Sequence, residues 1–453
     1  MGDDEKPPIV EGENGILLQF HDLSGFPRGM YINEEEWEQA QTDGFSFGPM
    51  VTEWVENYNT RGVVEPMQFT ANEGYMNAIA DPDTLVSVPW REGNCRKAIC
   101  DLENTNGSDF ELCSRSKLAK AVDSLAELGY EAKVGSEIEF NLLTEFETDR
   151  LRREGTDYIE EAATSDLGAV YHLRPLEERS KYLSELNAVM KQMGYKIEGL
   201  HKESSPGMFE ALLRYTDAVH QADAVATFRL SAQAIGRRHG LTPIFMPMPM
   251  SDYEGNSQHY HISLWQHGEN AFYDPDGSED VADVAYHFIG GVLEHAKGIT
   301  VLCAPTVNSY KRLQPGMWAP VNINYGHDNA STMIRIPTPR EEGTRVEIRI
   351  PDNSANPYLS LAGILVAGAD GIKNRIDPGE PSEEDVYEAE SDDYRQLPDS
   401  LGEAVDALNE DTFLCDFLGE ELINQFSRLK RDEARRYNQA VTDWDVREYI
   451  NRM

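Results

Sequence analysis

Alternation of apolar and polar positions is the clearest pattern in this chain. In residues 137–140, 259–264 and 345–350 every second side chain is apolar, which is the period of a strand with one buried face. Such strands usually belong to a sheet whose other face meets water. Here, however, the polar faces carry mainly Glu, His and Arg, whereas solvated faces usually mix Thr, Lys, Glu and Gln.

Other stretches predict helices and a small strand-rich region. Apolar positions at helical spacing end at Gly129 and Gly240, which act as stop signals. The predicted helices span residues 34–42, 114–129, 216 or 217 to 238, 401–408, 415–429 and 431–440. Short apolar stretches bounded by Gly, Asn and Asp predict strands at 15–20, 62–69 and 84–90. A polar stretch at 103–109 is the expected domain boundary.

The charge balance excludes several classes of partner. The chain has 80 acidic and 40 basic residues, a net charge of −40, and no apolar run long enough to span a membrane. Nucleic acid and anionic membranes should be repelled. We interpret the charge as a solvated acidic surface suited to high salt, in a halophilic cytoplasm. The acidic, Pro-bearing start lacks the features of a secretion signal.

Five cysteines are scattered along 453 residues, and no pair has C-x-x-C spacing. A zinc site and a disulfide framework are therefore not supported. We expect free, buried thiols at Cys95, Cys100, Cys113, Cys303 and Cys415.

The polar strand faces combine the groups that a phosphate-and-metal site needs. Hard divalent cations prefer carboxylate oxygens, and arginines stabilise a transferring phosphoryl group. The candidates on the three strands are Glu137, Glu139, His259, His261, Ser263, Arg345, Glu347 and Arg349. A Gly/Pro loop at 201–210 adds Glu203 and Glu210, although alone it is a weak signal.

These segments resemble the glutamine synthetase family over most of the chain. The most specific runs are Asn-Ser-Tyr-Lys-Arg-Leu at 308–313 and Pro-Asp-x-x-Ala-Asn-Pro-Tyr-Leu at 351–359. The resemblance implies an α+β fold with a small N-terminal β-grasp domain (1–108). It also implies a catalytic domain (109–453) with a curved antiparallel sheet backed by helices, in a cytoplasmic homododecamer of two stacked hexamers.

The resemblance further implies an ATP-dependent ligase that activates glutamate as γ-glutamyl phosphate, with two or three Mg²⁺ or Mn²⁺ ions per active site. By position, Glu137, His259 and Glu347 resemble the ligands of the metal beside the nucleotide phosphates. Likewise, Glu139, Glu203 and Glu210 resemble those of the metal near glutamate.

Other roles follow by the same matching of positions. Substrate binding is implied for Arg312 at the α-carboxylate and Arg349 at the γ-carboxylate, with Gly255 and Glu254 nearby. Phosphoryl transfer is implied for Arg335 and Arg345, with His201 reaching phosphate, and nucleotide contact for Glu198, Tyr215, His261 and Ser263. Tyr215 as a plain core residue and Glu198 as a surface residue remain alternatives.

The departures from the family pattern gather at the ammonia site. Trp318 stands where ammonia-using members carry a Glu that accepts a proton, and Gly48 and Tyr75 stand at two further Asp positions. Elsewhere Ala330 replaces an Arg, Glu254 an Asn and Lys202 a His.

Three lost carboxylates favour an organic amine, such as a polyamine, over ammonia. Trp318 could receive an alkylammonium by a cation–π contact, or could simply pack its loop. Two other hypotheses stay open: a glutamine synthetase that uses ammonia, and an inactive or regulatory paralogue.

Overall fold

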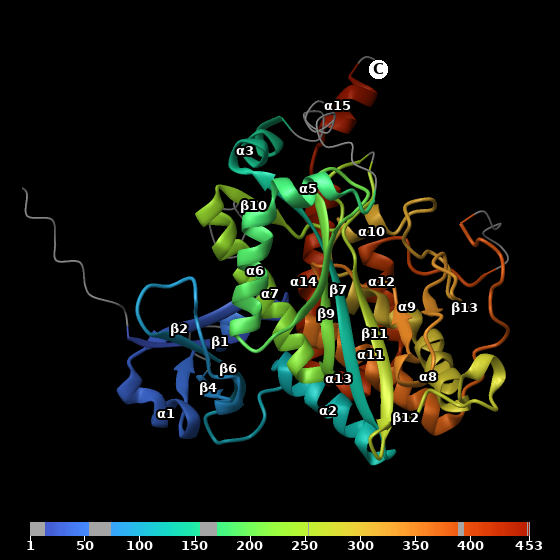
Figure 1. Ribbon diagram of the computed structural model, residues 1–453, viewed down its shortest axis with the longest axis horizontal. Helices are drawn as coiled ribbons and strands as arrows, with labels where there is room; N and C mark the ends of the chain where they lie inside the picture. Colours follow the sequence, from blue (N-terminus) through green and yellow to red (C-terminus); the bar gives the residue numbers. More distant parts are fainter. Residues whose placement is uncertain are drawn as a thin grey trace, which may run out of the picture.

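The computed structural model describes residues 14–53, 74–154, 170–251, 253–387, 394–450 and 452. It has a small N-terminal part beside a larger part built on a long central sheet (Figure 1). The N-terminal sheet ends at Asn104 and the next helix begins at Ser114, so the expected boundary at 108 falls in the link. The predicted strand at 62–69 lies outside the described residues.

The N-terminal sheet is mixed, with the strand order β2-β1-β6-β4-β3. Its strands are β1 Gly15–His21, β2 Pro27–Ile32, β3 Phe45–Phe47, β4 Met76–Ala80, β5 Val86–Ser87 and β6 Cys95–Asn104. β1 and β6 are parallel, while β5 pairs with β6 off the main path. The strand predicted at 84–90 is shorter than expected, because Asp81 caps a 3-10 turn at Pro82–Thr84.

The larger part contains a nine-stranded sheet whose main path runs β13-β14-β15-β11-β7-β9-β8. All its pairs are antiparallel except β13 with β14. Its strands are β7 Glu131–Thr144, β8 Ile197–Lys202, β9 Met208–Asp217, β10 Leu241–Ile244, β11 Gln258–Gln266, β12 Glu269–Asn270, β13 Tyr325–His327, β14 Ile334–Ile336 and β15 Val346–Ile348. β7 lies at the centre, between β11 and β9.

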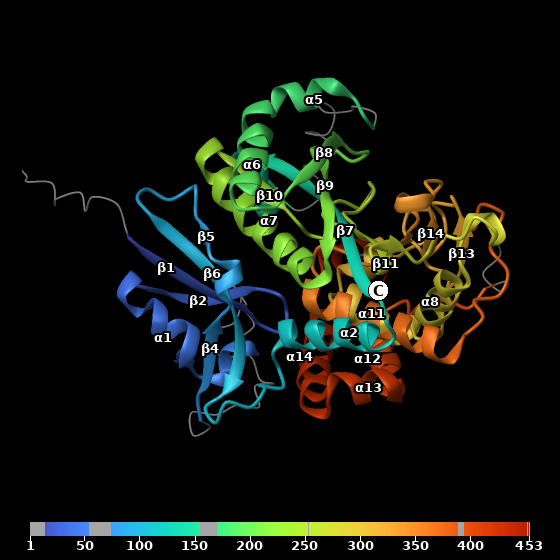
Figure 2. The same ribbon diagram turned by 60° about the horizontal axis from the view of Figure 1, so that its bottom comes forward.

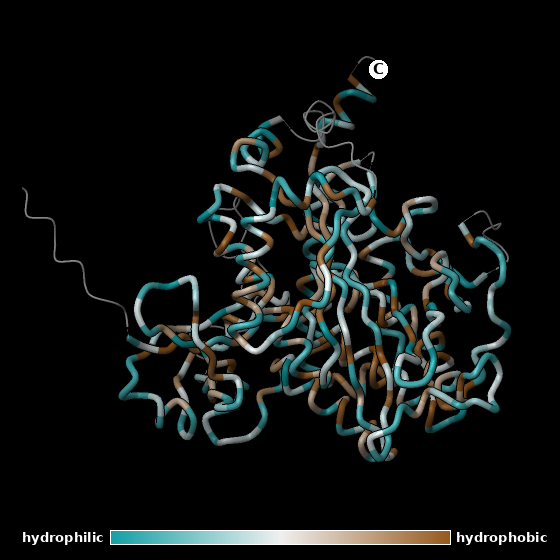
Figure 3. The backbone as a smooth tube through the Cα atoms, viewed as in Figure 1, coloured by the Kyte–Doolittle hydropathy of each residue, from teal (hydrophilic) through white to brown (hydrophobic). Residues whose placement is uncertain are grey.

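Helices back this sheet, and α11 packs against α2, α8 and α9 (Figure 2). The helices are α1 Trp37–Thr42, α2 Ser114–Glu127, α3 Glu145–Glu154, α5 Leu173–Glu178, α6 Ser180–Gln192, α7 Ala218–His239, α8 Asp283–Glu294, α9 Ala296–Cys303, α10 Ser309–Arg312, α11 Pro357–Asn374, α12 Leu401–Glu410, α13 Thr412–Leu418, α14 Glu420–Gln439 and α15 Asp443–Tyr449. This arrangement confirms the α+β fold class. Loops at the outer edge are mostly hydrophilic (Figure 3).

Helix ends followed their local signals at some points and not at others. The Asp217 side chain caps α7 at one end, and Gly240 closes the other at φ 64°. The predicted break between 415–429 and 431–440 is wrong. The chain breaks instead at Gly419, whose φ of 91° favours glycine. α14 continues past 430 to Gln439 because the residues that follow, such as Ala434 and Arg435, are good helix formers.

The expectation of free, buried thiols is met at four of the five cysteines and is wrong for the burial of Cys415. All five cysteines are free, and only Cys415 is not buried. Within those same ranges no helix is both long enough and apolar enough to cross a membrane.

Candidate active site

The polar face of β7 is the base of the site, because antiparallel neighbours bring other strands' charged residues directly opposite it. His259 on β11 pairs with Glu137, and Glu210 on β9 pairs with Glu139. His201 on β8 in turn pairs with Glu210. The residues between them, such as Ile138, are fully buried in the core on the other face. The face that could have met water therefore lines a cavity.

A first cluster joins three strands through Glu137, His259 and Glu347, whose ligand atoms lie within 4.8 Å of one another. His259 Nδ1 lies 3.2 Å from Glu137 Oε2 and 3.3 Å from Glu347 Oε1. His259 Nε2 is buried without a hydrogen-bond partner. Two carboxylates and one imidazole, whose Nε2 has no hydrogen-bond partner, suit a divalent cation.

Two arginines hold Glu347 in place. Arg335 Nε lies 2.6 Å from Glu347 Oε2, and Arg349 Nη1 donates to Glu347 Oε1 at 2.7 Å. Burial opposes ionisation of this 0 % exposed carboxyl, but Arg349 and the two histidines keep the pKa of Glu347 below its ordinary value. Glu347 is therefore a carboxylate that orients both guanidiniums.

A second cluster lies one strand pair further along, at His201, Glu203 and Glu210. His201 Nε2 is 2.8 Å from Glu203 and 3.2 Å from Glu210. Burial alone would lower the pKa of His201, yet the two carboxylates raise it to about 10. His201 therefore bridges the two carboxylates, and the three side chains form a second group whose ligand atoms could hold a metal ion.

Glu139, expected as a ligand here, is turned differently. Its Oε2 accepts a hydrogen bond from the backbone N–H of Ser257, and it is not among the three grouped side chains. It still lines the same cavity, and its charge, with that of Glu137, adds to burial in raising the pKa of Glu210 to about 8. The membership of Glu139 in the metal site stays a prediction.

All the candidate residues line one of two adjoining cavities. The larger cavity, of about 490 Å³, is lined by both clusters, His201 included. It is also lined by Glu139, Glu254, Gly255, Arg312, Trp318, Arg335 and Arg349. The smaller, of about 330 Å³, contains Glu198, Tyr215, His261, Ser263 and Arg345. Glu137 lines both, so a phosphate chain in one cavity would reach the metal ligands of the other.

Part of the wall of the larger cavity is held by close packing and hydrogen bonds. Arg312 is 1 % exposed and donates to the backbone oxygens of Ile350 and Arg349. A Cβ at Gly255 would lie 2.3 Å from the oxygen of Pro247, so only glycine fits there. Glu254 accepts a hydrogen bond from Ser204, and burial followed by repulsion from Glu203 and Glu139 raises its pKa.

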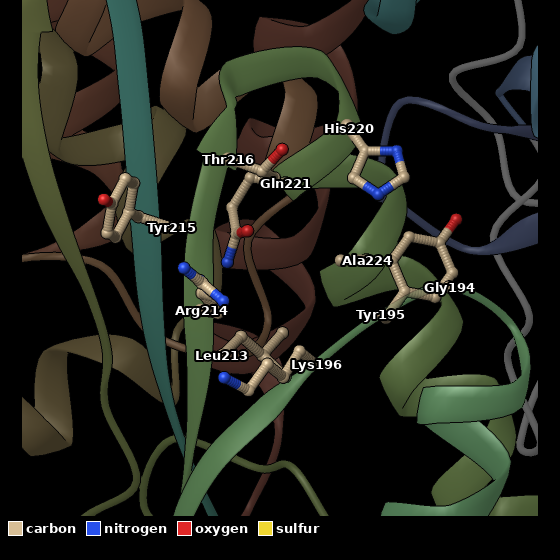
Figure 4. Close-up of a pocket in the computed structure, with 10 residues that line it drawn as sticks. All are labelled: Gly194, Tyr195, Lys196, Leu213, Arg214, Tyr215, Thr216, His220, Gln221 and Ala224. Carbon is tan, nitrogen blue, oxygen red and sulfur yellow. The ribbon is translucent and has the colours of Figure 1, made fainter.

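In the smaller cavity, Arg345 Nε donates to His261 Nδ1 at 3.0 Å, and His261 reaches Glu137 at 2.7 Å. Tyr215 is 43 % exposed, so it is not a core residue. Figure 4 shows it on the side of β9 toward β7, turned away from Tyr195 and His220. Its ring lies nearly parallel to that of Trp265, with centroids 6.5 Å apart.

At the outer end of the larger cavity stands Trp318, with a left-handed backbone at φ 53° and a side chain 58 % exposed. Its ring meets that of Tyr387 edge to face at 5.9 Å. Tyr387 donates to the oxygen of Ala330 and also bonds Arg349. Trp318 therefore packs its loop and faces the cavity at once. Gly48 and Tyr75 line neither cavity.

The sequence interpretation missed Tyr171 and Tyr387. The Tyr171 ring lies 4.8 Å from that of His201, on a backbone with φ 64°. Both tyrosines come from irregular segments, where no periodicity marks a side chain as facing a site.

Comparison with known proteins places the chain among ligases. The glutamine synthetase catalytic-domain model matches residues 111–449. Glutamine synthetases of Halobacterium salinarum and Pyrococcus furiosus are 35 % and 36 % identical over 452 residues, covering 98 % and 96 % of this chain and 95 % and 96 % of theirs.

Solved structures show the same similarity to ligases. GmaS without ligand and GmaS with ADP are each 31 % identical, with TM-scores of 0.84 and 0.85, and the match covers 97 % of both chains. The predicted family is thereby confirmed: the chain belongs to the glutamine synthetase family, and it is an ATP-dependent ligase that forms carbon–nitrogen bonds.

Proposed function

We propose that this enzyme is a γ-glutamyl–amine ligase that joins glutamate to a small organic amine. The observation that carries the proposal is Trp318, an aromatic side chain in the glutamate cavity at the position where ammonia-using relatives carry a carboxylate. The likeness to GmaS, a γ-glutamylmethylamide synthetase, supports it. We include polyamines among the acceptors to be tested.

The first step follows from the charged side of the cavity. The γ-carboxylate of glutamate, held by Arg349, attacks the γ-phosphorus of ATP, and ADP leaves with the electron pair of the broken P–O bond. Arg335 and Arg345 stabilise the charge on the transferring group. Mg²⁺ or Mn²⁺ at Glu137, His259 and Glu347, and at Glu203 and Glu210 with Glu139, would neutralise phosphate charge when bound. We propose two or three such ions per site.

The second step takes place at the Trp318 end. An unprotonated amine nitrogen attacks the γ-carbonyl carbon of γ-glutamyl phosphate, and phosphate leaves with the C–O electron pair. The departing phosphate takes the proton that the nitrogen loses as the amide forms. Beforehand, the alkylammonium lies with its alkyl group on the ring faces of Trp318 and Tyr171. Glu254, a carboxylate of the same cavity that is not among the proposed metal ligands, attracts its charge and receives its proton.

A second candidate is glutamine synthetase proper. The full-length relatives carry that name, and Glu203 and Glu254 could attract ammonium in place of the lost carboxylates. A third candidate is an inactive or regulatory paralogue. It is supported by Ala330, which lines the cavity where the family pattern has an Arg. For all three we propose a cytoplasmic dodecamer of two stacked hexamers and a halophilic surface, consistent with the −40 charge.

One experiment separates these functions. Full-length protein in molar salt, with ATP, glutamate and Mg²⁺ or Mn²⁺, is given ammonium, methylammonium, ethylammonium, putrescine or spermidine. We expect phosphate release and amide formation to be fastest with an alkylamine. Equal or faster reaction with ammonium favours glutamine synthetase, and no turnover with any acceptor favours the inactive paralogue.

A further inference from the structure

The largest of the cavities described here lies away from the active site, at the junction of the two parts of the chain. Its volume is about 680 Å³, larger than either active-site cavity. Its walls come from the N-terminal sheet, α7, α14 and the loops that contain Phe26, Phe245, Val307 and Asn353. The residues that matter for its chemistry are His21, Phe26, Ala226, Arg229, Leu230, Phe245, Val307, Asn353, Leu429, Lys430, Glu433 and Arg436.

Two polar atoms in this wall are buried without partners. Arg229 donates through Nη1 to the oxygen of Ala355 and through Nη2 to Gln258, but its Nε has no acceptor. Asn353, 3 % exposed, has no donor for its Oδ1. A buried donor or acceptor left unsatisfied costs about 1–3 kcal/mol, so such atoms call for a ligand or water.

The electrostatics of the cavity favour an anion. Within the described part of the chain Arg229 forms no ion pair with a carboxylate. Burial lowers its pKa, which Asp352 offsets only in part. Burial and the nearby cations Lys97, Arg229 and Arg115 also lower the pKa of His21 to about 3, so this histidine adds no charge.

The remaining charges on the wall are already matched. Lys430 lies 3.8 Å from Glu433, and Arg436 donates to Asp432 at 2.7 Å. The rest of the wall is largely apolar, with Phe26, Leu230, Phe245, Val307 and Leu429. An occupant that fits therefore carries one negative group and an apolar body.

We propose that this cavity binds a small organic carboxylate with an apolar chain, its carboxylate on Arg229 and a hydrogen-bond donor on Asn353. Of the ligands with this chemistry, an apolar amino acid supplies the donor through its ammonium group, whereas a simple carboxylic acid does not. Figure 4 shows a third cavity, lined by residues such as Tyr195, His220 and Gln221. It offers no comparable case, because none of its lining residues has a buried polar atom without a partner.

Occupancy would be felt at the active site. Asn353 Nδ2 donates to the backbone oxygens of Glu139 and Ser257, at 2.7 and 2.8 Å. The Ser257 N–H holds the Glu139 carboxylate, and Gln258, the partner of Arg229, precedes His259. A ligand that shifts Asn353 or Arg229 thus acts on the strand that carries the candidate metal ligands.

The test is calorimetric titration of the full-length protein, saturated with glutamate to block the active site, with L-leucine, 4-methylpentanoate and L-leucinamide. We expect L-leucine to bind most tightly, 4-methylpentanoate more weakly and L-leucinamide not at all. Arg229→Gln should weaken L-leucine binding by about 10- to 100-fold. Ala226→Leu, which fills the cavity, should abolish it while the protein stays folded.

Equal binding of L-leucinamide, unchanged binding in Ala226→Leu, or no binding of either carboxylate would each overturn the proposal. Loss of assembly in Ala226→Leu would also overturn it, because the cavity would then be filled by a second copy of the chain. Arg229→Lys, which keeps the charge, guards against misreading a folding defect in Arg229→Gln. The readout needs no ligase activity, so it is independent of the proposed function.

Discussion

The larger cavity has two ends that are built differently: the proposed phosphate end around Glu347 and the proposed acceptor end around Trp318. At the phosphate end several charged groups lie on or next to a strand and contact another charged group, as when Glu347 holds Arg335 and Arg349. At the acceptor end the side chains come from loops, and Trp318 is supported mainly by the ring of Tyr387. The phosphate end, held by contacts between charged groups, suits the reaction that the family shares. The acceptor end is formed by loops, which can differ between family members, and so it suits the choice of acceptor.

The largest effect should come from the phosphate end. Glu137→Gln removes a charge that faces His259 and His261, and we expect kcat to fall by roughly 10²–10³-fold with every acceptor. Steady-state phosphate release measures it. Glu131→Gln, an exposed position of the same strand, is the matched control. Activity of Glu137→Gln within tenfold of wild type would contradict the assigned role.

A change at the acceptor end should alter preference more than rate. Trp318→Glu restores a carboxylate and removes the aromatic face, so kcat/KM for ammonium relative to methylammonium should rise by about 10- to 100-fold. Trp318→Phe keeps the aromatic face and should change the ratio little. If both variants keep the wild-type ratio, Trp318 only packs its loop and the comparison fails.

Metal affinity should depend on pH at the phosphate end. Burial and repulsion from Glu137 and Glu139 raise the pKa of Glu210 to about 8, and a metal needs the carboxylate form. Binding of Mn²⁺ should therefore tighten as pH rises toward 8, by up to about tenfold per unit, and level off above it. Titration between pH 6.5 and 8.5 tests this, with Glu210→Gln as the control. A flat profile would contradict the raised pKa of Glu210.

The smallest effect should come from the link between the two ends. Tyr387→Phe keeps the ring beneath Trp318 but removes the hydroxyl that bonds Arg349 and the oxygen of Ala330. We expect KM for glutamate to rise by about 3- to 10-fold, in line with one lost hydrogen bond, and acceptor preference to stay. Tyr394→Phe, a tyrosine that bonds Glu384 and lines neither cavity, is the control. A changed acceptor ratio would mean that the two ends are not separable.

Much of the phosphate end follows from the sequence by itself. A period of two puts Glu137 and Glu139 on one face and Ile138 on the other, whatever the neighbouring strands are. Local caps likewise set the ends of α7, because Asp217 and Gly240 satisfy or free the backbone without distant help.

Only the tertiary structure decided which of these groups meet. Strand register sets His259 opposite Glu137, and it gathers His201 with Glu203 and Glu210 while Glu139 turns to Ser257. The meeting of Trp318 with Tyr387, and of Arg229 with Asn353 in one cavity, joins segments far apart in the chain. Periodicity determines which face a side chain is on, but long-range packing determines what lies opposite it.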